Sequence, residues 1–160
     1  MITLTLPYPI SANRYWASRV IKVKGKPMPQ VYVTAEAKEY REKVAAMALA
    51  AGVRKPIDGR VTISAQLYPH RPLDYKTRQR KLGAAWEDGG HGVPAVQCLD
   101  VDNTPKVLLD SLKGIAFGDD RWVRRLVFER MEPDDKGARV VITIAAMPAE
   151  QPQADLLEAA

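Results

Sequence analysis

Residues 99–123 read LDVDNTPKVLLDSLKGIAFGDDRWV, and this stretch decides the order of elements in the second half of the chain. Its first four residues alternate apolar and acidic side chains, which predicts an extended segment with Asp100 and Asp102 on one face. Pro105 suits the first turn of a helix, so we expect a helix over residues 105–115. The glycines that follow predict a turn before the next strand.

The flanking sequence supplies the remaining elements, because apolar and polar residues alternate in several short runs. The expected strands cover residues 2–6, 61–67, 122–131 and 138–147, and a second helix covers residues 35–52. The segment EPDDKG at 132–137 predicts a hairpin between the last two strands. The resulting order is β-α-β-(long loop)-α-β-β, an α+β fold in which two main helices pack on a small mixed β-sheet.

Two long segments show no sustained period. We interpret residues 10–33 as an extended loop and residues 69–97 as a longer loop in which residues 74–86 form a short basic helix. The chain length suits one domain, which we place at 1–147, including the extended loop at 69–97. Residues 148–160 form a flexible acidic tail in this interpretation.

Composition narrows the class of protein. Lysine and arginine together number 24 against 19 acidic residues, and the acidic tail makes the rest of the chain more basic still, which favours a polyanionic partner only weakly. The single cysteine, Cys98, forms no internal disulfide, as is usual in a reducing compartment. No apolar run approaches the roughly 20 residues needed to cross a bilayer. We therefore expect a cytoplasmic protein without membrane contact.

An acidic cluster is the strongest chemical signal. Two neighbouring aspartates repel each other unless a cation lies between them, and Mg²⁺ bound by carboxylates and water is the usual solution. Lys106, Asp110 and Lys113 follow on one stripe of the expected helix. Asp119 and Asp120 lie where the chain turns back toward the sheet, so we expect a third carboxylate to join Asp100 and Asp102. Three such groups suit metal-assisted phosphodiester hydrolysis.

Simpler interpretations compete with each feature. An isolated Asp-x-Asp is more often a solvated turn than a metal site, and a charged helix stripe is usually a solvated face. His70, His91 and Cys98 lack the paired spacing of a zinc site. The basic run from His70 to Lys81 suits a phosphate backbone about as well as it suits a solvated loop. The residues expected to contact nucleic acid in this run are Arg71, Lys76, Arg78 and Arg80.

An ordered set of motifs resembles the RusA family of Holliday junction resolvases. A strand ending at proline precedes SANRYW, and VTAEAKEYREKV resembles the family's first helix. The most specific block is LDVDNTPKVLLDSLKGIAFGDDRWV, with an Asp-x-Asp-Asn, a lysine four residues after the second aspartate, and a closing Asp-Asp. The resemblance covers residues 1–147 apart from 69–97, which is longer than the family's usual basic loop.

The resemblance implies a bacterial or phage-encoded homodimer that nicks four-way DNA junctions in pairs, with Mg²⁺ or Mn²⁺ as cofactor. Position by position, Asp100, Asp102 and Asp120 match the metal-binding carboxylates, and Lys106 matches the essential lysine. Asn13 and Arg14 of the SANRYW segment join the residues expected to contact DNA. A two-fold dimer would present one active site to each of two opposed junction strands.

Two rival functions fit the same residues. In the first, the chain is a non-catalytic module that binds branched DNA, and its acidic cluster is structural. In the second, the metal chemistry holds but the nuclease acts on flaps, forks or single strands, because residues 69–97 reshape the binding face.

Overall fold

The computed structural model describes residues 1–83, 96 and 98–148, and every structural statement below concerns these residues. The strands are β1 (Ile2–Pro7), β2 (Trp16–Val23), β3 (Lys26–Val33), β4 (Val61–Tyr68), β5 (Val123–Arg130) and β6 (Arg139–Ala146). The α-helices are α1 (Ala12–Tyr15), α2 (Ala35–Ala50), α3 (Tyr75–Leu82) and α5 (Pro105–Leu112). Short 3₁₀ turns cover Val101–Asn103 (η1) and Asp120–Trp122 (η2). The mixed α+β class is confirmed.

The central sheet has four strands in the order β1-β6-β4-β5. β6 pairs antiparallel with both β1 and β4, whereas β4 and β5 are parallel. The expected hairpin between the last two strands is therefore wrong, because β4 lies between β5 and β6. A parallel pair needs a long crossover connection, and here that connection carries α5.

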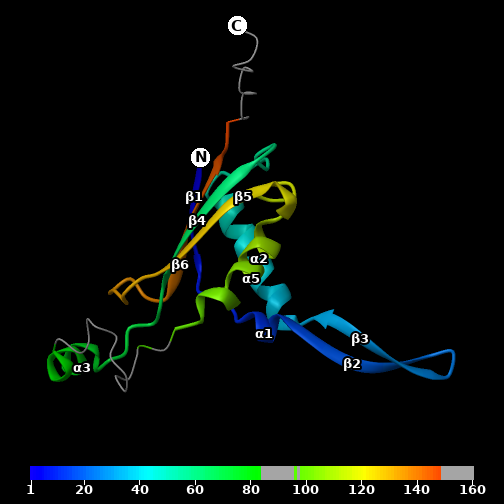
Figure 1. Ribbon diagram of the computed structural model, residues 1–160, viewed down its shortest axis with the longest axis horizontal. Coiled ribbons are helices and arrows are strands. Elements are labelled where there is room, and N and C mark those ends of the chain that lie inside the picture. Colours follow the sequence, from blue (N-terminus) through cyan, green and yellow to red (C-terminus); the bar gives the residue numbers. More distant parts are fainter. Residues whose placement is uncertain (84–95, 97, 149–160) are drawn as a thin grey trace, which may run out of the picture.

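The core lies between one face of this sheet and the helices α2 and α5, which cover that face together (Figure 1). Alternate residues of β4 and β6 point into it, as the period of two predicts, and each is at most 1% exposed. These residues are Val61, Ile63, Ala65, Leu67, Val140, Ile142 and Ile144. Phe117, which follows α5, is completely buried and belongs to the same core. The burial of these large side chains stabilises the domain by the hydrophobic effect.

The segment 10–33, expected to be a loop, is instead a short helix followed by a β-hairpin. α1 leads into β2, and β2 pairs antiparallel with β3 along its full length from Trp16↔Val33 to Val23↔Lys26. The ribbon extends away from the rest of the molecule (Figure 1). The sequence did not predict this hairpin because Pro27 and Pro29 argue against a central strand. In a two-stranded ribbon each strand has one edge that faces solvent, and a proline, which has no backbone N–H to donate, is tolerated there.

The backbone conformation of the acidic stretch, residues 100–103, also differs from the prediction. Asp100 has an extended backbone, but residues 101–103 form the turn η1 rather than a strand, so the two carboxylates do not share a strand face. α5 ends at Leu112, three residues earlier than expected, and Lys113 is its C-cap.

Within 69–97, α3 confirms a short basic helix, although Trp86 lies outside the described residues, as does the tail from residue 149.

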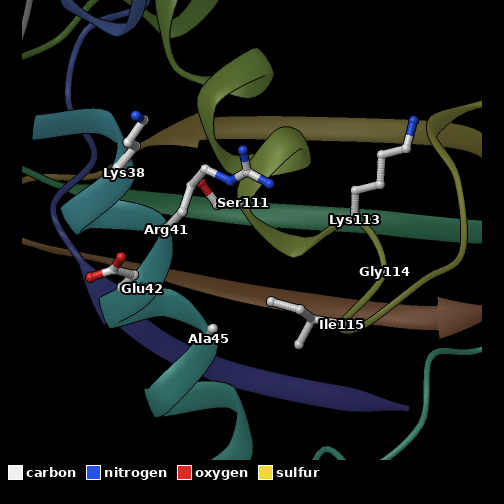
Figure 2. Close-up of a pocket in the computed structure, with 8 residues that line it drawn as sticks. All are labelled: Lys38, Arg41, Glu42, Ala45, Ser111, Lys113, Gly114 and Ile115. Atoms are coloured by element: carbon white, nitrogen blue, oxygen red, sulfur yellow. The ribbon is translucent and has the colours of Figure 1, made fainter. Parts of the chain in front are cut away.

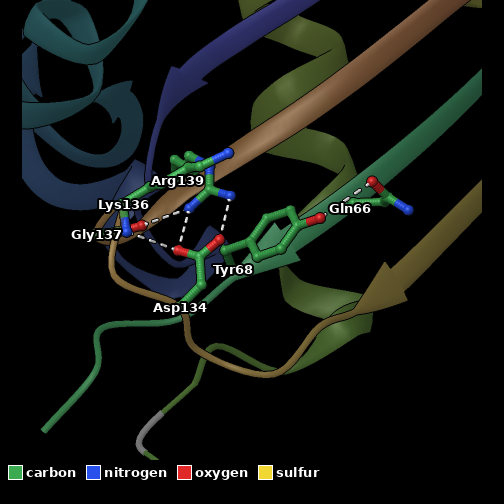
Figure 3. Close-up of polar contacts among 6 residues, drawn as sticks. All are labelled: Gln66, Tyr68, Asp134, Lys136, Gly137 and Arg139. Carbon is green, nitrogen blue, oxygen red and sulfur yellow. Dashed lines mark hydrogen bonds and ion pairs between the residues drawn. The ribbon is translucent and has the colours of Figure 1, made fainter.

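A polar cluster secures the connection between β5 and β6 (Figure 3). The Arg139 guanidinium donates two hydrogen bonds of 2.6 Å to the carboxylate of Asp134 and one of 3.0 Å to the Gly137 carbonyl. It also stacks on the Tyr68 ring, 3.9 Å from its centre. The two hydrogen bonds from Arg139 lower the pKa of Asp134 to about 2, because they favour the charged carboxylate. The contacts hold the end of β4 against the start of β6.

Candidate active site

The turn η1 carries the first acidic pair, Asp100 and Asp102, and both side chains are exposed. The Asp100 carbonyl accepts hydrogen bonds from the Asn103 amide and the Thr104 hydroxyl, each at 3.1 Å. Thr104 is completely buried. A buried side chain therefore fixes the backbone from which the two carboxylates project toward solvent.

A tyrosine secures the residues just before this turn. The Tyr8 hydroxyl accepts a hydrogen bond of 2.9 Å from the Leu99 amide and donates one to Cys98 Sγ at 3.2 Å. Burial, together with the bond to Cys98, raises the pKa of Tyr8 to about 12, so the hydroxyl stays protonated at neutral pH. Tyr8 follows β1 directly, and it ties the acidic turn to the sheet.

Lys106 lies in the first turn of α5, close to the acidic turn. Its Nζ is 3.4 Å from the Asp110 carboxylate one helical turn later, and the Lys106 side chain is 60% exposed. An exposed pair of this length is weak. The ammonium group therefore remains available to an incoming anion.

The second acidic pair, Asp119 and Asp120, follows α5. Lys113 Nζ lies 2.9 Å from Asp119 Oδ2 and 3.1 Å from Asp120 Oδ1. The two carboxylates raise the pKa of Lys113, and Lys113 with the Arg121 amide lowers the pKa of Asp119. Asp120 Oδ1 is buried, and although the ammonium is near, this oxygen accepts no hydrogen bond within the described chain. A buried carboxylate oxygen without such a bond suits the binding of a cation.

The two acidic pairs lie at opposite ends of α5. This helix has eight residues, which corresponds to a length of about 12 Å. Tyr8, which holds the first pair, lies where β6 begins, whereas the second pair precedes β5 at the end of the sheet where β6 finishes. Accordingly, no group of three or more His, Cys, Asp or Glu side chains that could hold a metal occurs in the described part of one chain. One chain does not bring Asp100, Asp102 and Asp120 together.

A cationic pocket of about 430 Å³ borders the second acidic pair. Lys38 and Arg41 line it from α2, and Lys113 lines it from the end of α5 (Figure 2). Glu42, the acidic residue of the lining, points away from the Arg41 guanidinium in this view. Sequence reasoning missed Lys38 and Arg41, although their spacing of three residues on a helix places both on one face.

The residues expected to contact nucleic acid fall in two places. Asn13 and Arg14 are exposed on α1, and Arg14 forms a 2.9 Å ion pair with Glu36. Those of the basic segment lie on or beside α3, which projects at the other end of the molecule's long axis from the β2–β3 ribbon (Figure 1).

The cationic side chains of this basic segment differ in whether they have interaction partners among the described residues. Arg71 stacks on Tyr75, and Arg78 pairs with Asp74 at 2.7 Å. Lys76 and Arg80 are exposed without such contacts among the described residues. These two side chains are free to meet phosphates. Of the rejected zinc ligands, His91 lies outside the described residues, and His70 and Cys98 join no metal-binding group.

Comparison with known proteins gives a clear family match. The family model described as endodeoxyribonuclease RusA matches residues 7–145, which is most of the chain. A search of curated proteins found no match. The matched range contains both acidic pairs, Lys106 and the cationic pocket. In the described residues, no helix has the length and apolarity to cross a membrane.

Proposed function

The chain belongs to the RusA family of endodeoxyribonucleases, which are Holliday junction resolvases, and we propose that it cuts four-way DNA junctions by paired, Mg²⁺-dependent nicking. The observation that carries this proposal is the anchored turn η1, which presents Asp100 and Asp102 to solvent directly before the helix that carries Lys106. The proposed place of action is the cytoplasm of a bacterium or of a phage-infected cell.

We propose that Asp100, Asp102 and Asp120 hold the divalent ion, as expected of a family whose nucleases are generally metal-dependent. Carboxylate oxygens are the ligands that Mg²⁺ prefers, and Asp120 Oδ1, a buried oxygen that faces the Lys113 ammonium at 3.1 Å, fits such a ligand. When bound, the ion would activate a water molecule and offset negative charge on the scissile phosphate. Mn²⁺ has similar ligand preferences and is an expected substitute.

A homodimer reconciles this ligand set with the separation seen within one chain. In a two-fold dimer, each contact between residues i and j occurs twice, once in each direction. We propose that the end of α5 carrying Asp102 in one subunit meets the end carrying Asp120 in the other. Each of the two resulting sites would then serve one of the two opposed junction strands.

The chain's own cations would act on the DNA backbone. Lys106 is largely exposed and only weakly paired, so its ammonium group would neutralise a phosphate oxygen beside the acidic turn. Lys38 and Arg41 would bind a neighbouring phosphate in the pocket beside Lys113. Lys76 and Arg80 on α3 would contact a more distant part of the junction. Recognition would therefore depend on phosphate positions and junction shape.

Incubation of the purified protein with a labelled four-way junction and Mg²⁺, with EDTA as the control, tests the proposal. Asp102→Asn removes one charge from the acidic turn, and we expect it to lower cleavage at least about 100-fold while junction binding persists. Asp58→Asn, a change at an exposed aspartate in the turn before β4, serves as the matched control and should leave cleavage intact. Binding without any cutting by the wild-type protein would favour the non-catalytic alternative.

Substrate choice needs a separate measurement. Competition among four-way junctions, flaps, forks and single strands would rank them under identical salt and metal concentrations. A preference for the four-way junction is the expected result. A consistent preference for flaps or single strands would support the other branched-substrate nuclease instead.

A further inference from the structure

The β2–β3 ribbon is a projecting element with a firmly anchored base. Tyr15, at the end of α1, is 1% exposed and contacts the Trp16 ring edge to face with 5.0 Å between ring centres. At the other strand, the Thr34 amide bonds the Tyr15 carbonyl at 3.0 Å, and the Thr34 hydroxyl bonds the Arg14 carbonyl at 2.8 Å. Both strands are thus fixed to the domain where α1 and α2 meet.

The ribbon concentrates positive charge. Residues 16–33 contain four cationic side chains and no acidic one, whereas the net charge of the whole chain is +5. The four are Arg19, Lys22, Lys24 and Lys26. The three lysines gather at the tip, all are exposed, and within the described chain none has an ion-pair partner. The tip is therefore an uncompensated cationic site.

The turn at the tip contains a lysine in an unfavourable backbone conformation. Lys24 has φ +50° and Gly25 has φ +78°, and Lys24 is the one non-glycine residue of the described chain with a positive φ. Two-residue hairpin turns of this kind prefer asparagine, aspartate or glycine at the first position. Backbone strain of this type is found most often at active sites, ligand clamps and switch regions. The strained turn places an exposed cation at the tip of the ribbon.

The strands hold further side chains ready for contact. Arg19 donates a 2.9 Å hydrogen bond to Gln30 Oε1, and its guanidinium lies 5.3 Å from the centre of the Tyr32 ring. On the opposite face, Val20 and Val31 are 72% and 65% exposed. A ribbon of eight residues per strand is about 27 Å long, and its width suits the major groove of DNA.

We propose that the β2–β3 ribbon is a DNA-binding arm that lies along one duplex arm of the branched substrate, with Lys22, Lys24 and Lys26 on backbone phosphates. This inference rests on the proposed function, since it takes branched DNA as the ligand. Charge complementarity favours DNA as the occupant, because an exposed cluster of lysines without acidic partners attracts a polyanion. The α1 residues Asn13 and Arg14 lie at the root of the same arm.

The variant Lys24→Asn separates binding from folding. Asparagine tolerates a positive φ, so the melting temperature should rise by about 1–4 °C. Loss of one phosphate contact should weaken junction binding about eightfold at 0.1 M salt and make the slope of log K against log salt shallower by about 0.9. Binding is measured by fluorescence anisotropy of a labelled four-way junction in EDTA across a salt series.

A triple variant and a control complete the design. Lys22→Gln, Lys24→Asn and Lys26→Gln together should reduce the slope by about 2.7, whereas Lys55→Gln, beyond the far end of α2, should leave it at the wild-type value. With Mg²⁺, the triple variant should need a higher enzyme concentration than the wild type to reach half-maximal cutting, because the tip contributes to substrate binding.

The outcomes are distinguishable. If the wild-type protein neither binds nor cuts branched DNA, the proposed function fails. If it does both and the triple variant binds with an unchanged salt slope, the ribbon proposal alone is overturned. Sedimentation of both proteins tests the other occupant, a second copy. A triple variant that dissociates into monomers would identify the ribbon as a subunit contact and also overturn the proposal.

Discussion

Removal of one buried hydroxyl should reveal how far catalysis depends on the acidic turn. Thr104 is completely buried, and its hydroxyl donates a 3.1 Å hydrogen bond to the Asp100 carbonyl. Thr104→Val keeps the branched shape of the side chain. The Asp100 carbonyl still accepts a hydrogen bond from the Asn103 amide, so it is not left without a donor. The expected cost is one net hydrogen bond, about 0.5–1.5 kcal/mol. In a chain of this size, that corresponds to a fall of roughly 1–6 °C in melting temperature.

The effect on cutting should be larger than the effect on stability. A misplacement of about 1 Å of a catalytic group can lower a rate about 100-fold, and the Thr104 hydroxyl fixes the backbone of a proposed metal ligand. We therefore expect single-turnover junction cleavage to fall about 10- to 100-fold well below the melting temperature. Tyr40→Phe is the matched control, because it removes a 3.1 Å hydroxyl-to-carbonyl bond between α2 and the end of β1. Wild-type cutting by Thr104→Val, or an equal loss in both variants, would refute a positioning role for Thr104.

Two further predictions concern the dimer and the β5–β6 connection. A mixture of Asp102→Asn and Asp120→Asn subunits should regain cutting of one junction strand. If each site is shared across two subunits, a mixed dimer has one site in which both mutated ligands are present and one in which both are intact. A nicking assay that shows no recovery would place each site within one chain. Because its folded pKa is lowered to about 2 from an ordinary 3.8, Asp134 stabilises the fold above pH 3.8, and this contribution disappears as the pH falls toward 2. Urea unfolding should therefore show Asp134→Asn less stable than wild type at pH 6 and similar to it near pH 2, and a constant difference across this range would contradict the assignment.

Local patterns predicted most of the elements that pack against the core. Alternation in β4 and β6 is strict because one face of each strand is buried, and Thr34 caps α2 through a 3.2 Å bond from the Ala37 amide. The strand order was not predictable in the same way. β5 and β6 are neighbours in sequence, but the insertion of β4 between them depends on packing between distant segments.

In the candidate site, too, the local features were predictable from the sequence and their arrangement in space was not. The sequence identified both acidic pairs and Lys106 by residue type and spacing. The alternation at Asp100 and Asp102 resembled a strand, yet the residues form a 3₁₀ turn that is held by bonds to the Asp100 carbonyl. Spacing also carries no information on distance in space, so the separation of the pairs by α5 was not foreseen. The pocket around Arg41 was missed because its two lining helices are far apart in sequence.

The short length of α5 has a consequence for how the chain tolerates insertions and deletions. One added residue in a helix rotates everything beyond it by about 100° and moves it about 1.5 Å along the axis. An insertion between Lys106 and Lys113 would therefore turn the first acidic pair and Lys106 away from the second acidic pair and Lys113. Variation in length should accumulate in the connection between α3 and η1, while α5 keeps its eight residues.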